Sequence, residues 1–163
     1  MHYFLKPIPL LSLLLLIALL GCTKPTYTHQ KSAFILIKSN QLKFADMGFI
    51  YQGNQSTKVE IYASGQALLA LRIYNNSICM DRYKCLDPQS FNQRFLVSYY
   101  PKEFLSNIFN QQPIFGSQNL IRSTNGFRQR IVTQDLNIDY WIKGSELYFK
   151  DYSNGVLIKV KEQ

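Results

Sequence analysis

The chain has 163 residues and a formal net charge of +8, with 18 Lys and Arg against 10 Asp and Glu. The cations are scattered rather than clustered in a run, which excludes a basic nucleic-acid-binding arm, so no nucleic-acid partner is expected. The last histidine in the chain is His29, which argues against histidine-dependent nucleophilic catalysis in the domain that follows it. We therefore expect a protein that is not an enzyme and that uses no metal and no cofactor.

The first 21 residues have the order of a bacterial signal peptide. Lys6 gives a weakly basic start, residues 8–20 form an apolar run, and Gly21 is a small residue directly before Cys22. The apolar run is shorter than the roughly 20 residues that a membrane-spanning helix needs, so a permanent transmembrane anchor is not expected. Residues 19–22 (LLGC) resemble the lipobox of bacterial lipoproteins, which implies cleavage between Gly21 and Cys22 and acylation of Cys22. An ordinary secretory signal with a chance cysteine is the alternative.

A lipidated Cys22 predicts a membrane-anchored protein, because each buried CH₂ of an acyl chain contributes about 0.8 kcal/mol. Thr23 follows the cysteine, where enterobacterial sorting rules place Asp in lipoproteins retained at the inner membrane. By resemblance to those rules we expect the outer membrane, with the protein facing the periplasm. Residues 22–31 show no apolar period and are predicted to be a tether, and residues 32–163 are predicted to be a single, monomeric domain.

Two further cysteines, Cys79 and Cys85, lie close together in the expected domain. An even pair at this spacing in an oxidising periplasm predicts a disulfide that closes a short loop. Free thiols are the second possibility. A zinc site is the least favoured, because no histidine or second cysteine pair accompanies them.

The expected domain is dominated by β-branched and aromatic residues with an apolar period of two, which is typical of antiparallel strands with one wet face. The turn residues that punctuate this pattern include Ser64-Gly65 and Ser153-Asn154-Gly155. We predict an α+β fold, mostly antiparallel β, with a strongly curved sheet of seven or eight strands that forms a half-barrel. The predicted strands are residues 33–38, 42–52, 57–63, 66–74, 127–134, 136–142, 146–150 and 155–160.

Two short helices are predicted between the fourth and fifth of these strands. Asp87 is a suitable N-cap for a helix over residues 89–96. Pro101 suits the first turn of a second helix, in which Phe104 and Ile108 lie on one apolar face, and Gln111-Gln112-Pro113 ends it. We expect both helices to cover the apolar side of the sheet as a lid.

The order of these elements resembles the LolA/LolB family of periplasmic lipoprotein carriers and outer-membrane lipoprotein receptors. The resemblance covers about residues 40–160. Residues 44–51 (FADMGFIY) resemble the family's first long strand, and residues 58–73 (KVEIYASGQALLALRI) resemble its next hairpin, with a glycine in the turn. Residues 101–113 fall where the family has its helical insertion.

This resemblance implies a hydrophobic half-barrel that binds the acyl chains of lipoproteins received from a LolA-like carrier and delivers them to the outer membrane. The family's receptor has an exposed leucine in the hairpin turn that promotes membrane insertion. Here Ser64 stands at that position beside Gly65, and Leu68 follows closely as the candidate replacement. The residues predicted to line the acyl-chain site are Ile61, Leu69, Leu71, Ile73, Phe104, Ile108, Ile138, Tyr140 and Phe149.

Other interpretations of the same residues stay open. Any sheet with one dry face would use this set as an ordinary core. The domain would then be a lipoprotein subunit or interaction module of a cell-envelope complex, or an inhibitor-type fold closed by its disulfide.

Overall fold

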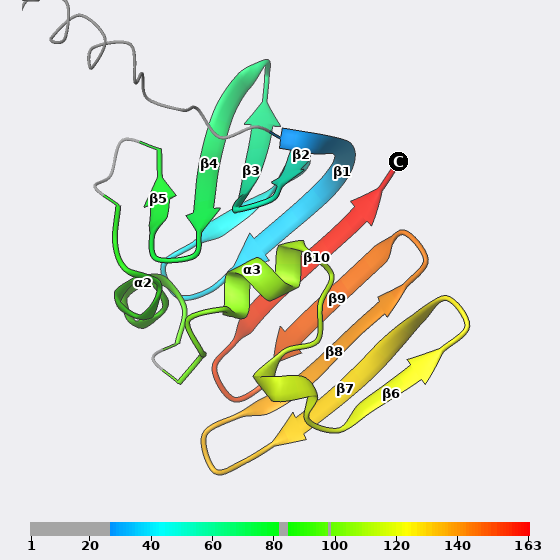
Figure 1. Ribbon diagram of the computed structural model, residues 1–163. Coiled ribbons are helices and arrows are strands. Elements are labelled where there is room, and N and C mark those ends of the chain that lie inside the picture. The colour runs from blue at the N-terminus through cyan, green and yellow to red at the C-terminus, as the bar shows by residue number, and fades with distance from the viewer. Residues whose placement is uncertain (1–26, 82–84, 98) are drawn as a thin grey trace, which may run out of the picture.

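The computed structural model describes residues 27–81, 85–97 and 99–163. The predicted signal peptide, its predicted cleavage site and the predicted acylation site at Cys22 lie outside the described residues. The described chain forms one ten-stranded antiparallel sheet with helices on one side of it (Figure 1). The strands are β1 (Tyr27–Lys38), β2 (Lys43–Gly53), β3 (Ser56–Ala63), β4 (Gln66–Tyr74), β5 (Ile78–Met80), β6 (Leu120–Ser123), β7 (Gly126–Val132), β8 (Asn137–Lys143), β9 (Glu146–Asp151) and β10 (Val156–Glu162).

The sheet consists of two meanders joined by the first and last strands. Its order is β5-β4-β3-β2-β1-β10-β9-β8-β7-β6, so β5 and β6 are the two edges and the sheet does not close on itself. β1 pairs with β10 in a register that sets Ile35 opposite Val160. We call β1–β5 the N-terminal half and β6–β10 the C-terminal half. Because β1 and β10 pair, the two halves share one continuous inner surface.

The mostly antiparallel fold is confirmed, and every strand predicted from the period of two is present. The predicted strand count of seven or eight was too low, because β5 and β6 were not foreseen. β5 is a run of three buried residues, and all of β6 beyond Leu120 is exposed, so neither alternates. The predicted tether over residues 22–31 was also too long. β1 begins at Tyr27, which pairs with Gly53 of β2. Residues 27–31 therefore belong to the sheet although they have no apolar period.

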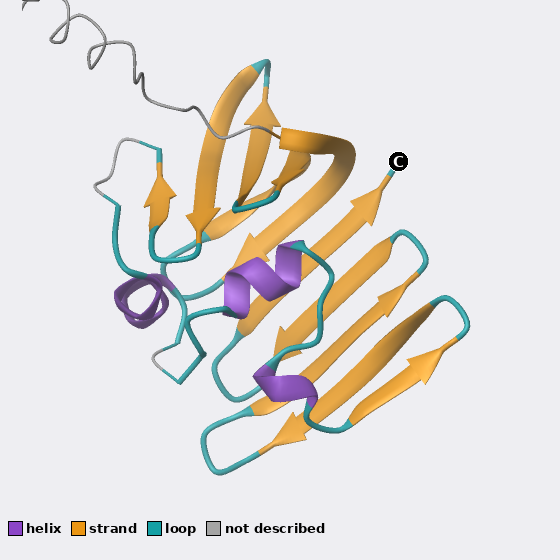
Figure 2. Ribbon diagram, in the orientation of Figure 1, coloured by secondary structure: helices purple, strands orange, loops and turns teal. Residues whose placement is uncertain are grey.

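The helices lie on the inner side of the sheet (Figure 2). α2 (Pro88–Phe95) begins as predicted, since the Asp87 carboxylate accepts a hydrogen bond from the Ser90 N–H at 3.0 Å. Hydrogen bonding with the Ser90 side chain, and next with its backbone N–H, lowers the pKa of Asp87. α3 (Phe104–Phe109) ends before Gln111-Gln112-Pro113, as predicted, but it begins three residues later than the predicted start at Pro101, which lies in the turn before it. A single 3₁₀ turn, η1 (Phe115–Ser117), leads from α3 to β6.

Alternate residues of the strands point to the inner side and are buried there beneath the helices. Along β8, for example, Ile138, Tyr140 and Ile142 are buried and the residues between them are not. The predicted disulfide is present, with Cys79 of β5 bonded to Cys85 beyond the turn. It holds the edge strand β5 against the chain segment that leads into α2.

Candidate apolar-ligand site

The nine residues predicted to line an acyl-chain cavity all belong to one hydrophobic core. Each exposes 3% or less of its surface. They come from β3, β4, β8 and β9 on the sheet and from α3 above it. An acyl chain therefore reaches this set only if a covering element moves, and their role as a ligand site stays a prediction.

Aromatic rings fill the centre of that core. The Phe104 ring of α3 lies 4.2 Å from the Tyr100 ring and 4.9 Å from the Phe149 ring, measured between ring centres. Tyr140 packs 6.1 Å from Phe149 on the neighbouring strand. Tilted and edge-to-face rings at these separations attract each other beyond the effect of burial. They attach the start of α3 to β9 of the C-terminal half.

A buried carboxylate supports this aromatic centre. Asp151 is fully buried, and its Oδ2 accepts hydrogen bonds from the Tyr100 hydroxyl at 2.9 Å and from the Asn154 amide at 2.8 Å. Burial, together with the charge and hydrogen bond of Asp151, raises the pKa of Tyr100 well above its ordinary value. Tyr100 therefore stays protonated and remains a donor to Asp151.

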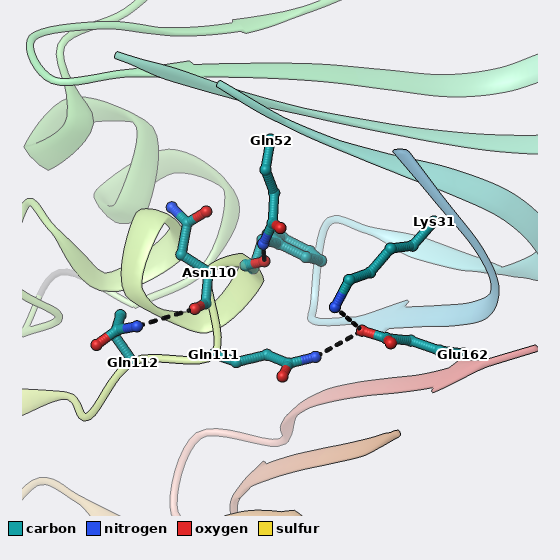
Figure 3. Close-up of polar contacts among 7 residues, drawn as sticks. Lys31, Gln52, Asn110, Gln111, Gln112 and Glu162 are labelled. Atoms are coloured by element: carbon teal, nitrogen blue, oxygen red, sulfur yellow. Dashed lines mark hydrogen bonds and ion pairs between the residues drawn. The ribbon is translucent and has the colours of Figure 1, made fainter. Parts of the chain in front are cut away.

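The C-terminal end of α3 is held by a small set of polar contacts with both halves of the sheet (Figure 3). The Gln52 amide of β2 donates to the Phe109 carbonyl at 3.0 Å. The Gln111 amide donates to the Glu162 carboxylate of β10 at 2.7 Å, and the same carboxylate pairs with Lys31 of β1 at 2.8 Å. We call these contacts the α3 clasp. These contacts are only partly buried, and the Thr57 and Tyr140 hydroxyls donate further hydrogen bonds to Asn110 and to the Gln112 carbonyl.

The segment after α3 is held by a buried glutamine. Gln129 of β7 is fully buried, and its amide makes three hydrogen bonds: it accepts from the Ile114 N–H at 2.8 Å and donates to the carbonyls of Ile114 at 3.0 Å and Gln118 at 2.7 Å. Within the same segment Gln111, Phe115, Ser117 and Asn119 all have positive φ. Non-glycine residues in this conformation cost free energy, which the Gln129 bonds offset.

A pocket opens at the end of the sheet between α2 and the β3–β4 hairpin. Its volume is about 540 Å³, within the range of roughly 300–1,000 Å³ that small-molecule sites occupy. Arg94 and Asp81 supply charged groups and Gln41 a polar one. The apolar part of the wall consists of Leu42, Phe44, Leu68, Leu69, Met80 and Phe95. We call this the hairpin pocket.

The hairpin pocket includes one residue of the predicted acyl-chain site, Leu69, and one of the predicted insertion turn, Leu68. Leu69 is fully buried, so the pocket floor is part of the core. Sequence reasoning did not single out Phe44, Met80, Phe95 or Arg94 for this role. They come from three separate elements, and no local pattern indicates that these elements meet.

The predicted insertion turn is an exposed hairpin turn. Ser64 and Gly65 both have positive φ and are exposed. The large apolar side chain near the tip is Leu68, which is 48% exposed. An exposed leucine at a hairpin is therefore present, displaced from Ser64 to Leu68 and adjoining the hairpin pocket. Whether it enters a membrane stays a prediction.

Comparison with protein-family models and with curated proteins gave no match. In the part of the chain that the structure describes, no helix is long and apolar enough to cross a membrane. Among the same residues, His, Cys, Asp and Glu side chains form no cluster of three or more that would hold a metal ion.

Proposed function

We propose that this protein is an outer-membrane lipoprotein that binds acyl chains. The hairpin pocket is the entrance, and the core beneath α3 opens to receive the rest of the acyl chain. The observation that carries the proposal is that Leu69 belongs both to the pocket wall and to the core. An apolar chain that enters beside Leu68 and Phe44 would therefore reach a core residue at the pocket wall.

Burial of a fatty chain in this space is favourable because each CH₂ removed from water contributes about 0.8 kcal/mol. The cost is the displacement of the segment that now fills the space. α3 has six residues and is fixed at its C-terminal end by the α3 clasp, so lifting it breaks few hydrogen bonds compared with opening the sheet. A movable α3 would thus act as the lid that the sequence resemblance implies.

The biological role we propose is that of a LolB-like receptor, which accepts lipoproteins from a LolA-like periplasmic carrier and passes them to the membrane. Leu68 is the residue we assign to membrane delivery. Its exposed position on the rim lets one side chain contact both the cargo in the hairpin pocket and a lipid surface.

Site-specific photocrosslinking tests the binding site. A photoreactive phenylalanine analogue replaces Leu68 in one variant and Val132 in a matched control. Both residues are exposed and apolar, at 48% and 61%, but Val132 lies on the opposite side of the sheet. We expect the analogue at position 68, and not at position 132, to yield adducts with the acyl chains of an added lipoprotein. Equal lipid adducts at the two positions, or none at position 68, would contradict the proposal.

The alternative function is that of a non-enzymatic subunit of a cell-envelope complex. It is supported by the burial of all nine predicted lining residues and by exposed apolar residues on the outer side, with Ile121 70% exposed and Val132 61% exposed. The same experiment separates the two functions. The alternative predicts protein adducts at position 132 and no lipid adducts at position 68.

A further inference from the structure

The outer surface of the C-terminal half, together with the adjoining ends of β1 and β2, carries most of the chain's excess positive charge. Its side chains stand in rows across the strands, because paired residues of neighbouring antiparallel strands point to the same side. One row runs Lys43, Lys38, Leu157, Lys150, Asp139 and Arg130; the next runs Leu36, Lys159, Tyr148, Trp141, Arg128 and Ile121; a third runs Phe34, Lys161, Glu146 and Lys143. We call this surface the cationic face.

The cationic face holds eight Lys and Arg side chains and two carboxylates. The carboxylates are already paired: Asp139 with Arg128 at 2.8 Å, and Glu146 with Lys161 at 3.2 Å. The other six cations have no ion pair with any carboxylate in residues 27–81, 85–97 and 99–163, and these are Lys38, Lys43, Lys143, Lys150, Lys159 and Arg130. The face therefore fits a partner that is anionic over a wide area.

Aromatic and aliphatic groups lie among these cations. The Trp141 and Tyr148 rings are stacked, with ring centres 5.4 Å apart and planes 12° apart, and the Lys159 Nζ lies 5.2 Å from the Tyr148 ring centre. Ile121 and Val132 are 70% and 61% exposed at one end of the face. Trp and Tyr flanked by Lys and Arg are typical of the interface between lipid headgroups and acyl chains. An acidic protein would be complementary to the cations alone.

The start of the described chain keeps the outer side of the sheet close to the lipid anchor. Tyr27 packs on the outer side of the sheet, with its ring centre 5.7 Å from that of Tyr51. The chain from Cys22 to Tyr27 spans at most about 18 Å when fully extended. If Cys22 carries the lipid, as the proposed function requires, the domain cannot leave the bilayer surface.

We infer that the cationic face docks on the surface of a bilayer that contains anionic phospholipids. The anchored domain then lies with the outer side of its C-terminal half toward the membrane. Each Lys or Arg near such a surface strengthens the attraction, and salt screens it within about a Debye length.

Trp141 reports directly on this contact because it is the single tryptophan of the chain. The full chain is reconstituted in vesicles of phosphatidylcholine alone or of phosphatidylcholine with phosphatidylglycerol, in each case with a brominated acyl chain as quencher. We expect a blue-shifted and quenched Trp141 emission in the anionic vesicles only, reversed at about 1 M salt, where the Debye length is near 3 Å. The acyl anchor is the same in both vesicles and cancels in the comparison.

Paired variants separate the face from the overall charge. Arg130→Gln with Lys143→Gln removes two exposed cations of the face without touching the Trp141–Tyr148 stack, and we expect the ratio of docked to undocked protein to fall by roughly thirtyfold. Arg72→Gln with Lys102→Gln removes the same charge from outside the face and outside the hairpin pocket, and it should leave the emission unchanged.

Identical Trp141 emission in the two vesicles would overturn the inference and leave the cationic face to another occupant, such as an acidic protein. An equal loss of quenching in the two variant pairs would overturn it as well. Neither readout involves the hairpin pocket, so failure here and failure of acyl-chain binding are distinguishable.

Discussion

The outer surfaces of the two halves of the sheet differ, although their inner surfaces are built alike. In the N-terminal half the outer charges of β3 satisfy one another. Lys58 pairs with Glu60 at 3.0 Å, the Tyr62 hydroxyl donates to Glu60 at 3.0 Å, and the Lys58 Nζ lies 4.0 Å from the Tyr51 ring centre. Burial and the nearby Glu60 raise the pKa of Tyr51 to about 12.

In the C-terminal half, by contrast, cations stand unpaired beside exposed apolar groups. The Lys58–Glu60 cluster of the N-terminal half stabilises the fold locally, whereas the cationic face of the C-terminal half has charge left for a partner. The two outer surfaces thus show which polar groups serve the structure and which are available for binding. The inner surfaces do not differ in this way, because both halves pack against the same core.

The largest expected effect is that of removing a ring from the shared core. Phe149→Ala should lower the free energy of unfolding by about 3–5 kcal/mol, because a fully buried ring is replaced by a cavity between Tyr100, Phe104 and Tyr140. Chemical denaturation followed by circular dichroism measures the change. Val132→Ala on the outer surface should change the free energy of unfolding by no more than about 0.5 kcal/mol. Two separate unfolding transitions in the wild-type protein would show that the halves do not share one core.

The next largest losses of stability are expected from substituting two glycines, one in each half, at which neighbouring strands approach closely. A Cβ at Gly48 would lie 2.0 Å from the Glu60 carbonyl oxygen, and a Cβ at Gly126 would lie 1.9 Å from the Ile142 carbonyl oxygen. Both atoms are backbone and cannot move freely, so we expect Gly48→Ala and Gly126→Ala each to cost about 1–3 kcal/mol. Gly65→Ala is the matched control: its φ is +77° but the space around it is open, so its cost should be about 1 kcal/mol. Equal losses at all three positions would refute the close approach.

The smallest effect concerns the Lys58–Glu60 cluster. Burial alone would raise the pKa of Glu60, but its hydrogen bonds with Lys58 and Tyr62 outweigh burial and lower it below 4.5. A lowered folded-state pKa adds stability above pH 4.5 that is lost as the pH falls through the folded value. Glu60→Gln should therefore cost up to about 1 kcal/mol at neutral pH and nothing in strong acid. If the difference in unfolding free energy between Glu60→Gln and the wild type does not change with pH, the Lys58–Glu60 cluster does not stabilise the fold in this way.

The fold was largely predictable because each long strand alternates between a buried and an exposed side chain. Val59 and Ile61 of β3, or Val156, Ile158 and Val160 of β10, indicate both the strand and its dry side. β5 and β6 were missed because three or four residues are too few for a period. The pairing of β1 with β10 was not predictable either, because it joins the two ends of the described chain and depends on packing rather than on local pattern.

The candidate site was predictable only in part. Leu68 and Leu69 were singled out because the hairpin resembles that of the LolA/LolB family. Phe44, Met80 and Arg94 meet them only through the curvature of the sheet and the position of α2, which no local pattern encodes. The disulfide needed no such information, since two cysteines separated by so short a loop have few other partners.

Depletion of the protein followed by membrane fractionation tests the receptor role most directly. The account predicts that outer-membrane lipoproteins accumulate in the periplasm and inner membrane, and that the wild type restores their sorting. Leu68→Asp should fail to restore it, whereas Tyr99→Asp should succeed, since Tyr99 is 57% exposed but lies outside the wall of the hairpin pocket. Unchanged lipoprotein sorting after depletion, or full rescue by Leu68→Asp, would contradict it.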